Sequence, residues 1–147
     1  MNIGDIRTAQ VFVTDPDRPL AEAARAMRDS HVGALVVVYT EDPQRRPRGI
    51  LTDRDIVRGQ LSKDADLYCL TVGDVMSRDP LCLRTDMSLG EGIEAMNSRA
   101  VRRAPVVDAA GSLVGIVTLD DLLPAIAAEL RSLAQLMGTQ AHRSDAR

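Results

Sequence analysis

Two matched segments carry the residue types best suited to chemistry. The segments GILTDRD and GIVTLDD each open a predicted strand with a glycine, place a threonine where the strand turns into a helix, and add an aspartate three residues later. One interpretation is structural, because threonine caps a helix and the aspartate complements the helix dipole. The other is functional. Amide groups and a hydroxyl at a helix N-terminus hold phosphate, and a nearby carboxylate accepts hydrogen bonds from a ribose diol. The spacing alone leaves both interpretations open for the four residues concerned: Thr52, Asp55, Thr118 and Asp121.

Positive charge is unequally distributed between the two segments. Arg54 follows the first threonine, whereas Asp120 occupies the corresponding helix start, and a carboxylate there disfavours phosphate unless it points away. Arg102 and Arg103 precede a predicted strand, while the matching residues 33 and 34 are glycine and alanine. The two arginines either form a solvated strand start or contact an anion. Because neighbouring strand residues face opposite ways, we expect only one of them to reach a ligand. We therefore expect one occupied site, or two of unequal affinity.

The remaining chemistry-bearing residues form no constellation in the sequence. His31 and His142 have no base, nucleophile or metal partner nearby, and Cys69 and Cys82 lack metal-ligand spacing. We therefore expect no catalysis, no metal and no cofactor in the strict sense. Cys82 is predicted to be a small core residue and Cys69 to lie in a linker, with a redox switch between them as an open alternative.

Composition narrows the class of protein. The chain has 147 residues, of which 45% are hydrophobic and 27% are charged, with a net charge of −3. These values are typical of one ordinary domain or two very small ones. The acidic balance argues against nucleic acid as a partner, and the 2% aromatic content argues against base stacking. No membrane-spanning run or secretory signal is recognisable, so we expect a reduced, cytoplasmic protein with no membrane partner.

The chain repeats itself. Residues 3–6 (IGDI) recur as residues 72–75 (VGDV), an offset of 69 residues that also carries Leu20 onto Leu89 and Met27 onto Met96. After a longer loop in the first copy, the offset becomes 66 residues and aligns the two glycine–threonine–aspartate segments. Such an ordered series of matches indicates an internal duplication.

Each copy is predicted to fold as strand, helix, strand, strand, helix, which gives a mixed α/β (α+β) protein. In the first copy we expect strands at 11–13, 34–39 and 49–51 and helices starting at Leu20 and Asp53. Copies this small bury too little surface to be stable alone, so they are expected to pack about a pseudo-two-fold axis. We divide the chain into repeat one (1–60), a linker (61–71), repeat two (72–127), and a helix extension with a loose polar tail beyond Gly138 (128–147).

These features resemble a tandem pair of cystathionine-β-synthase (CBS) domains. The segments TDRDI at 52–56 and VRRAPVV at 101–107 are similar to sequence motifs typical of that family. The resemblance extends from residue 3 to about residue 127. It looks closest to small stand-alone bacterial members, including those known as hypoxic response proteins. The resemblance implies two related clefts for adenosine-containing ligands, with Asp55 and Asp121 at ribose, and Thr52, Thr118 and the pair Arg102–Arg103 at phosphate.

The resemblance implies a regulatory module rather than an enzyme. We expect it to bind AMP, ADP, ATP or S-adenosylmethionine, to form a homodimer, and to act in trans on a partner protein that the sequence does not identify. The alternative is a dimeric interaction scaffold whose clefts bind no nucleotide. The missing cations of copy one and Asp120 favour the scaffold, and the two threonine–aspartate motifs favour the sensor.

Overall fold

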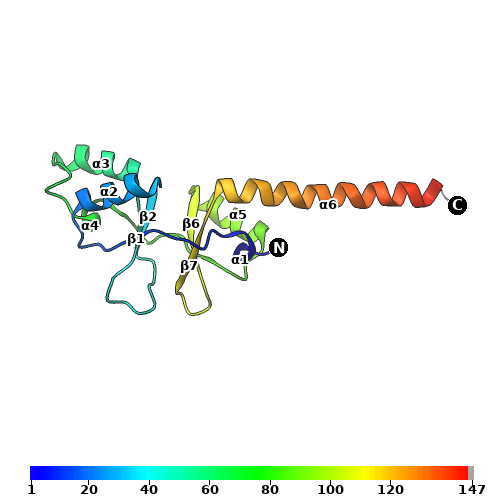
Figure 1. The fold of residues 1–147 in the computed structure, drawn as a ribbon, viewed down its shortest axis with the longest axis horizontal. Coiled ribbons are helices and arrows are strands. Elements are labelled where there is room, and N and C mark those ends of the chain that lie inside the picture. Colours follow the sequence, from blue (N-terminus) through cyan, green and yellow to red (C-terminus); the bar gives the residue numbers. More distant parts are fainter. Residues whose placement is uncertain (146–147) are drawn as a thin grey trace.

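Two small sheets, each covered by helices, make up the body of the protein (Figure 1). The structure is a computed structural model that describes residues 1–145. The elements of the first half are β1 (Val13–Thr14), α2 (Leu20–Ser30), β2 (Ala34–Val37), β3 (Gly49–Thr52) and α3 (Asp53–Lys63). Those of the second half are β5 (Leu83–Arg84), α5 (Leu89–Ser98), β6 (Arg103–Val107), β7 (Leu113–Thr118) and α6 (Leu119–Asp145). The predicted order of strand, helix, strand, strand, helix is therefore confirmed in both copies.

The two halves share one sheet topology. In the first, β1 pairs parallel with β2, and β2 pairs antiparallel with β3. In the second, β5 pairs parallel with β6, and β6 pairs antiparallel with β7. The first strand lies at Val13–Thr14 rather than at 11–13, because its partner in the sheet is the pair Val36–Val37. Thr14 is consequently buried there, while the side chains of Phe12 and Val13 are partly exposed.

Short helices are exchanged between the halves. Helix α1 (Ile3–Ile6) lies in the second half, where Ile3 is fully buried beside Leu83 and Leu89 and its N–H donates to the Met87 carbonyl at 2.8 Å. Helix α4 (Val72–Val75) lies in the first half, where fully buried Val72 joins the core. In Figure 1, α1 accordingly sits beside α5, and α4 lies near α2 and α3.

The segment between the copies also belongs to the first half. Leu70 is buried in that core, and the short strand β4 (Ser77–Arg78) pairs antiparallel with β3 and completes the first sheet. Helix α3 continues to Lys63, three residues beyond the boundary at residue 60 that we set for repeat one. A smaller cluster of Val36, Val38 and Leu113 joins the two halves, so the copies pack on each other as expected.

The last helix differs from our prediction. We expected a loose tail beyond Gly138, but α6 is one 27-residue helix that continues to Asp145. A single glycine costs about 1 kcal/mol relative to alanine, which does not stop a helix flanked by glutamine, alanine and methionine. The Thr139 hydroxyl donates to the Gln135 carbonyl at 3.0 Å, which adds a local bond on this turn. The tail prediction for residues 146 and 147 lies outside the described residues.

Candidate ligand clefts between the two repeats

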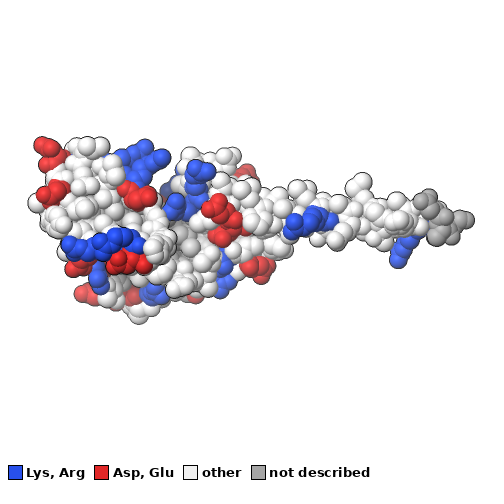
Figure 2. Space-filling model, turned by 45° about the horizontal axis from the view of Figure 1, so that its top comes forward, with Lys and Arg blue, Asp and Glu red and all other residues white. Residues whose placement is uncertain are grey.

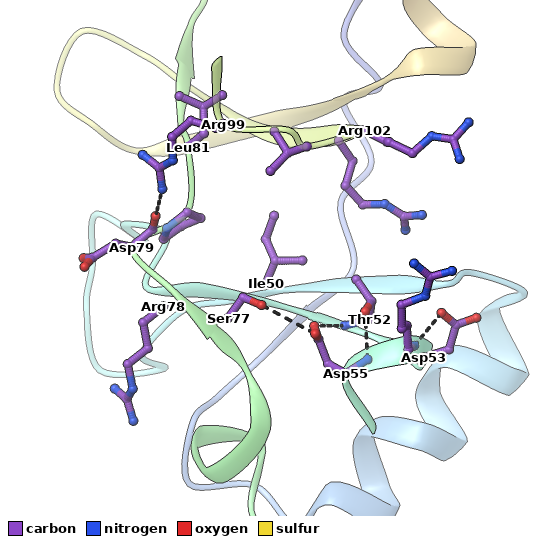
Figure 3. Close-up of a pocket in the computed structure, with 14 residues that line it drawn as sticks. Ile50, Thr52, Asp53, Asp55, Ser77, Arg78, Asp79, Leu81, Arg99 and Arg102 are labelled. Carbon is purple, nitrogen blue, oxygen red and sulfur yellow. Dashed lines mark hydrogen bonds between the residues drawn. The ribbon is translucent and has the colours of Figure 1, made fainter. Parts of the chain in front are cut away.

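The larger candidate site is a cleft of about 400 Å³ between the halves, called here the Thr52 cleft (Figure 3). Its floor comes from β3 and the first turn of α3, and its opposite wall from the segment that precedes β6. Apolar side chains of Ile50, Leu81 and Val101 alternate with charged ones around it. The full lining comprises Ile50, Thr52, Asp53, Arg54, Asp55, Ser77, Arg78, Asp79, Pro80, Leu81, Arg99, Val101, Arg102 and Arg103.

A second cleft of about 340 Å³, the Thr118 cleft, is the counterpart of the first. Its lining residues are Thr8, Gln10, Val11, Phe12, Val32, Gly33, Ala34, Arg103, Ile116, Thr118 and Asp121. Ten of the eleven map onto lining residues of the Thr52 cleft by the offsets of the internal repeat; Arg103 is the exception because it lines both. The duplication of the sequence has therefore produced two related clefts.

The threonine and aspartate of the Thr52 cleft form a capping box at the start of α3. The Asp55 N–H donates to Thr52 Oγ1 at 3.1 Å, and the Thr52 N–H donates to Asp55 Oδ2 at 2.9 Å. The structural interpretation of this motif is thus confirmed. The capping box does not occupy every acceptor site of the Asp55 carboxylate, because a carboxylate offers about four such sites. The other oxygen, Oδ1, lies 3.5 Å from the Ser77 hydroxyl on the cleft side (Figure 3). The cap therefore fixes Asp55 at the cleft with acceptor capacity left over.

The second motif has a different hydrogen-bond pattern. The Thr118 N–H donates to Asp121 Oδ2 at 2.9 Å, and the Thr118 hydroxyl also donates to Oδ2 at 3.1 Å. In the first motif the threonine hydroxyl accepts instead, so its proton is free to point at a ligand. In the second that proton is already used by the carboxylate. The two clefts are therefore unequal even in their matched residues.

The charged lining residues distinguish the two clefts more strongly than these hydrogen bonds do. Five arginines and three aspartates line the Thr52 cleft, whereas one arginine and one aspartate line the Thr118 cleft. Within residues 1–145, the guanidinium groups of Arg54, Arg102 and Arg103 make no ion pair with a carboxylate. Figure 2 shows basic side chains on both sides of the notch between the halves. The Thr52 cleft is thus the better place for an anion.

Both Arg102 and Arg103 line the Thr52 cleft, so both have access to it, and our expectation that only one of them contacts a ligand stays a prediction. The alternation rule does not separate the two side chains because β6 begins at Arg103, so Arg102 precedes the strand and is not bound by its pleat. Gly33 and Ala34, which match the two arginines, line the Thr118 cleft instead and bring no charge. Asp120 is exposed and is absent from the lining of either cleft among the described residues, so it points away as the prediction allowed.

The sequence interpretation overlooked part of the Thr52 cleft. Residues 77–81 form one side of it, and Arg99 holds this side by donating to the Asp79 carbonyl at 2.7 Å (Figure 3). The Arg78 side chain is also held, by the Gly73 carbonyl at 3.1 Å. The available signal was the repeat itself, since residues 77–81 match residues 8–12, four of which line the other cleft.

The cysteines and histidines lie outside this arrangement. Cys82 is partly buried, and its desolvation raises the pKa of the thiol, while a hydrogen bond with Asp66 raises the pKa of exposed Cys69. Both shifts favour the less reactive thiol form. His31 ends α2 in a left-handed conformation with φ of 55°, and His142 lies in α6. Across residues 1–145, no three histidine, cysteine or acidic side chains come together as metal ligands would.

Comparison with known proteins agrees with the duplicated fold. A sequence model of the CBS domain matches the chain twice, over residues 3–62 and 72–128. The chain belongs to the CBS-domain family. It is 35% identical over 118 residues to hypoxic response protein 1 of Mycobacterium tuberculosis, covering 80% of each chain. A crystal structure of hypoxic response protein I, described as having two coordinated zinc ions, has a TM-score of 0.74 and 34% identity. That match covers 85% of this chain and 98% of the other.

Other relatives set the limits of the comparison. An uncharacterised protein of Methanopyrus kandleri, MK0525, is 32% identical over 123 residues, and the match spans 84% of this chain but 61% of that protein. The inosine-5'-monophosphate dehydrogenase of Methanocaldococcus jannaschii is 34% identical over 113 residues, which are 77% of this chain but only 21% of the enzyme. The likeness to the dehydrogenase therefore concerns a small part of it. Among the described residues, no helix is both long and apolar enough to cross a membrane.

Proposed function

We propose that this CBS pair is a cytoplasmic regulatory sensor that binds an adenine nucleotide in the Thr52 cleft and acts on a separate partner protein, without catalysis of its own. One observation carries the proposal: a capped aspartate, a helix N-terminus and three arginines without carboxylate partners in residues 1–145 line one cleft. Its volume of about 400 Å³ lies in the range of small-molecule sites.

Each part of a nucleotide has a suitable group in this cleft. Asp55 Oδ1 would accept from the ribose hydroxyls, beside the Ser77 hydroxyl. Arg54, Arg102 and the first turn of α3 would hold phosphate, because both a guanidinium and a helix N-terminus favour anions. Ile50, Leu81 and Val101 offer an apolar wall for the base. S-adenosylmethionine carries a sulfonium and an ammonium group beside its single carboxylate and therefore a net positive charge, so we expect the arginines to select against it here.

The signal would be a shift in the orientation of the repeats. Thr52 and Asp55 belong to one repeat and Arg102 to the other, so a ligand held by all three links the two halves. The halves also meet through the small cluster of Val36, Val38 and Leu113. A ligand that binds one relative orientation better raises its population, and a partner protein recognises that state.

The Thr118 cleft supports the alternative, an interaction scaffold without nucleotide. There the threonine hydroxyl already donates to the aspartate, and one arginine lines the cleft. We therefore expect at most weak nucleotide binding in that cleft, and if the Thr52 cleft behaved the same way the scaffold would be the better account.

Calorimetry on the full chain with AMP, ADP, ATP and S-adenosylmethionine tests the proposal. We expect one tight site per chain for a phosphate-bearing ligand, with affinity that falls as salt is added. A folded protein that binds none of the four would refute the sensor and leave the scaffold.

A further inference from the structure

The C-terminal part of α6 leaves the body of the protein. Figure 1 shows this helix projecting well beyond α1 and α5. All residues from Glu129 to Ser144 are exposed. Four large apolar side chains are among them, with exposed fractions of 62% for Leu130, 60% for Leu133, 57% for Leu136 and 73% for Met137. A single helix of this length is marginal in water without a packing partner, so this segment requires one.

The apolar residues of α6 follow a heptad pattern. Leu123, Ile126, Leu130, Leu133 and Met137 are separated by alternating steps of three and four residues. This is the a and d pattern of a left-handed coiled coil, and it indicates that the partner is another helix. The neighbouring flank carries alanine at residues 127, 134 and 141, which allows close approach of a second backbone. This apolar stripe of α6, called here the seam, is therefore suited to a partner helix rather than to a flat surface.

The charges on the other flank fix the direction of that partner. This flank holds Glu129, Leu136 and Arg143, spaced seven residues apart. In an antiparallel pair of identical helices these flanks face each other. With the two-fold axis level with Gln135, Glu129 lies opposite Arg143 of the second copy twice and Leu136 lies opposite its own copy on this flank, while Ala134 lies opposite Ala134 on the other flank. In a parallel pair the acidic and basic residues are about 21 Å apart along the axis and never meet.

The same register also fits the body of the protein. It places residue 145 of one helix beside residue 125 of the other. Ala125 is the last buried residue of α6, where the helix still packs on the second core. Within the described residues, the paired length is therefore the part of α6 that lies beyond the second core.

We propose that α6 pairs antiparallel with α6 of a second copy of this chain, through the seam of Leu130, Leu133 and Met137 with Glu129 and Arg143 paired across it. The two bodies then lie at opposite ends of a short two-helix rod. This interface does not depend on nucleotide binding and leaves both clefts of each copy open.

Disulfide trapping tests this arrangement independently of any other contact between copies. In a C69S/C82S background, Ala134→Cys places a thiol at the two-fold axis of the antiparallel pair. The matched control Leu130→Cys places it about 15 Å from its own copy in that pair but adjacent in a parallel one. Both positions are exposed, so the body stays folded, which circular dichroism verifies. We expect the A134C protein to form a covalent dimer under mild oxidation and the L130C protein to form little.

Charge reversal supplies the second arm. Adding Glu129→Arg to the A134C protein should lower the cross-linked fraction several-fold, and adding Arg143→Glu as well should restore it. Preferential cross-linking of the L130C protein would overturn the proposal in favour of a parallel pair. Absence of cross-linking in both proteins would overturn it as well, because α6 would then be unpaired or reserved for a different protein.

Discussion

Replacement of Asp55 by alanine separates the two roles that this carboxylate has in the Thr52 cleft. The substitution removes the acceptor of the Thr52 N–H, so the cap at the start of α3 loses one hydrogen bond. A bond of this kind contributes roughly 1 kcal/mol to the free energy of unfolding. It also removes Oδ1, the atom we assign to ribose. Loss of a charge-assisted hydrogen bond costs about 1.5–3 kcal/mol, which corresponds to a roughly 10- to 150-fold weaker affinity.

Asp74 provides a matched control for this experiment. It forms the same capping box at the start of α4, where the Thr71 N–H donates to its carboxylate at 2.8 Å. Asp74 is exposed and is absent from the lining of both clefts among the described residues. Asp74→Ala should therefore reduce stability to a similar degree and leave affinity unchanged.

The assay combines nucleotide titration calorimetry with urea unfolding of the wild type and both variants. We expect both variants to lose stability and only the Asp55→Ala protein to lose affinity. If Asp55→Ala binds nucleotide like the wild type while losing stability, the aspartate is a helix cap and nothing more, and the ribose assignment is wrong. Asp121→Ala should weaken any binding in the Thr118 cleft in the same way.

Further expectations concern the arginines, packing and pH. Arg102→Ala should weaken nucleotide binding in the Thr52 cleft alone, whereas Arg103→Ala should weaken it in both clefts, as measured by the stoichiometry and affinity in calorimetry. Gly59→Ala should destabilise the protein by up to about 2 kcal/mol in urea unfolding. A Cβ there would lie 2.3 Å from Val75 Cγ1, and overpacking costs about 1–3 kcal/mol against a helix-propensity gain of about 1 kcal/mol. Stability should fall in acid, because N–H donation from Thr40 and Asp17 holds the pKa of Asp15 below its ordinary 3.8. The unfolded carboxylate then takes up protons first, so stability is lost as the pH falls through 3.8 and below, and Asp15→Asn should flatten that loss.

Much of the fold could be predicted because the duplication supplies every element twice. The helices starting at Leu20 and Leu89 were recognisable from matched apolar spacing. The strand predicted at 34–39 was recognisable from its apolar, β-branched run, although in the structure it ends at Val37. The exchange of α1 and α4 was not predictable in this way. A four-residue helix carries too few positions to show a period, and only tertiary contacts reveal that Ile3 belongs to the core of the other half.

The candidate site was predictable from its motifs but not from its walls. Thr52 and Asp55 stand in a local pattern whose geometry is set within four residues. Arg99 and Asp79 reach the cleft from the end of a helix and from an irregular segment, and no local pattern marks them. The position of Arg102 depended on where β6 begins, and strand ends are set by pairing across the sheet rather than by the residues themselves.

The exchange of α1 and α4 makes the folding of each repeat depend on the other. As the chain leaves the ribosome, residues 13–63 emerge without Val72 and Ser77, so the first core and its sheet cannot close until about residue 78 is free. Ile3 is synthesised early, but it can be buried only after Leu83 and Leu89 have been synthesised. Neither repeat can then fold or unfold independently of the other. A proteolytic cut between Lys63 and Leu70 should therefore release no stable half. A ligand bound to one repeat should protect both repeats from degradation.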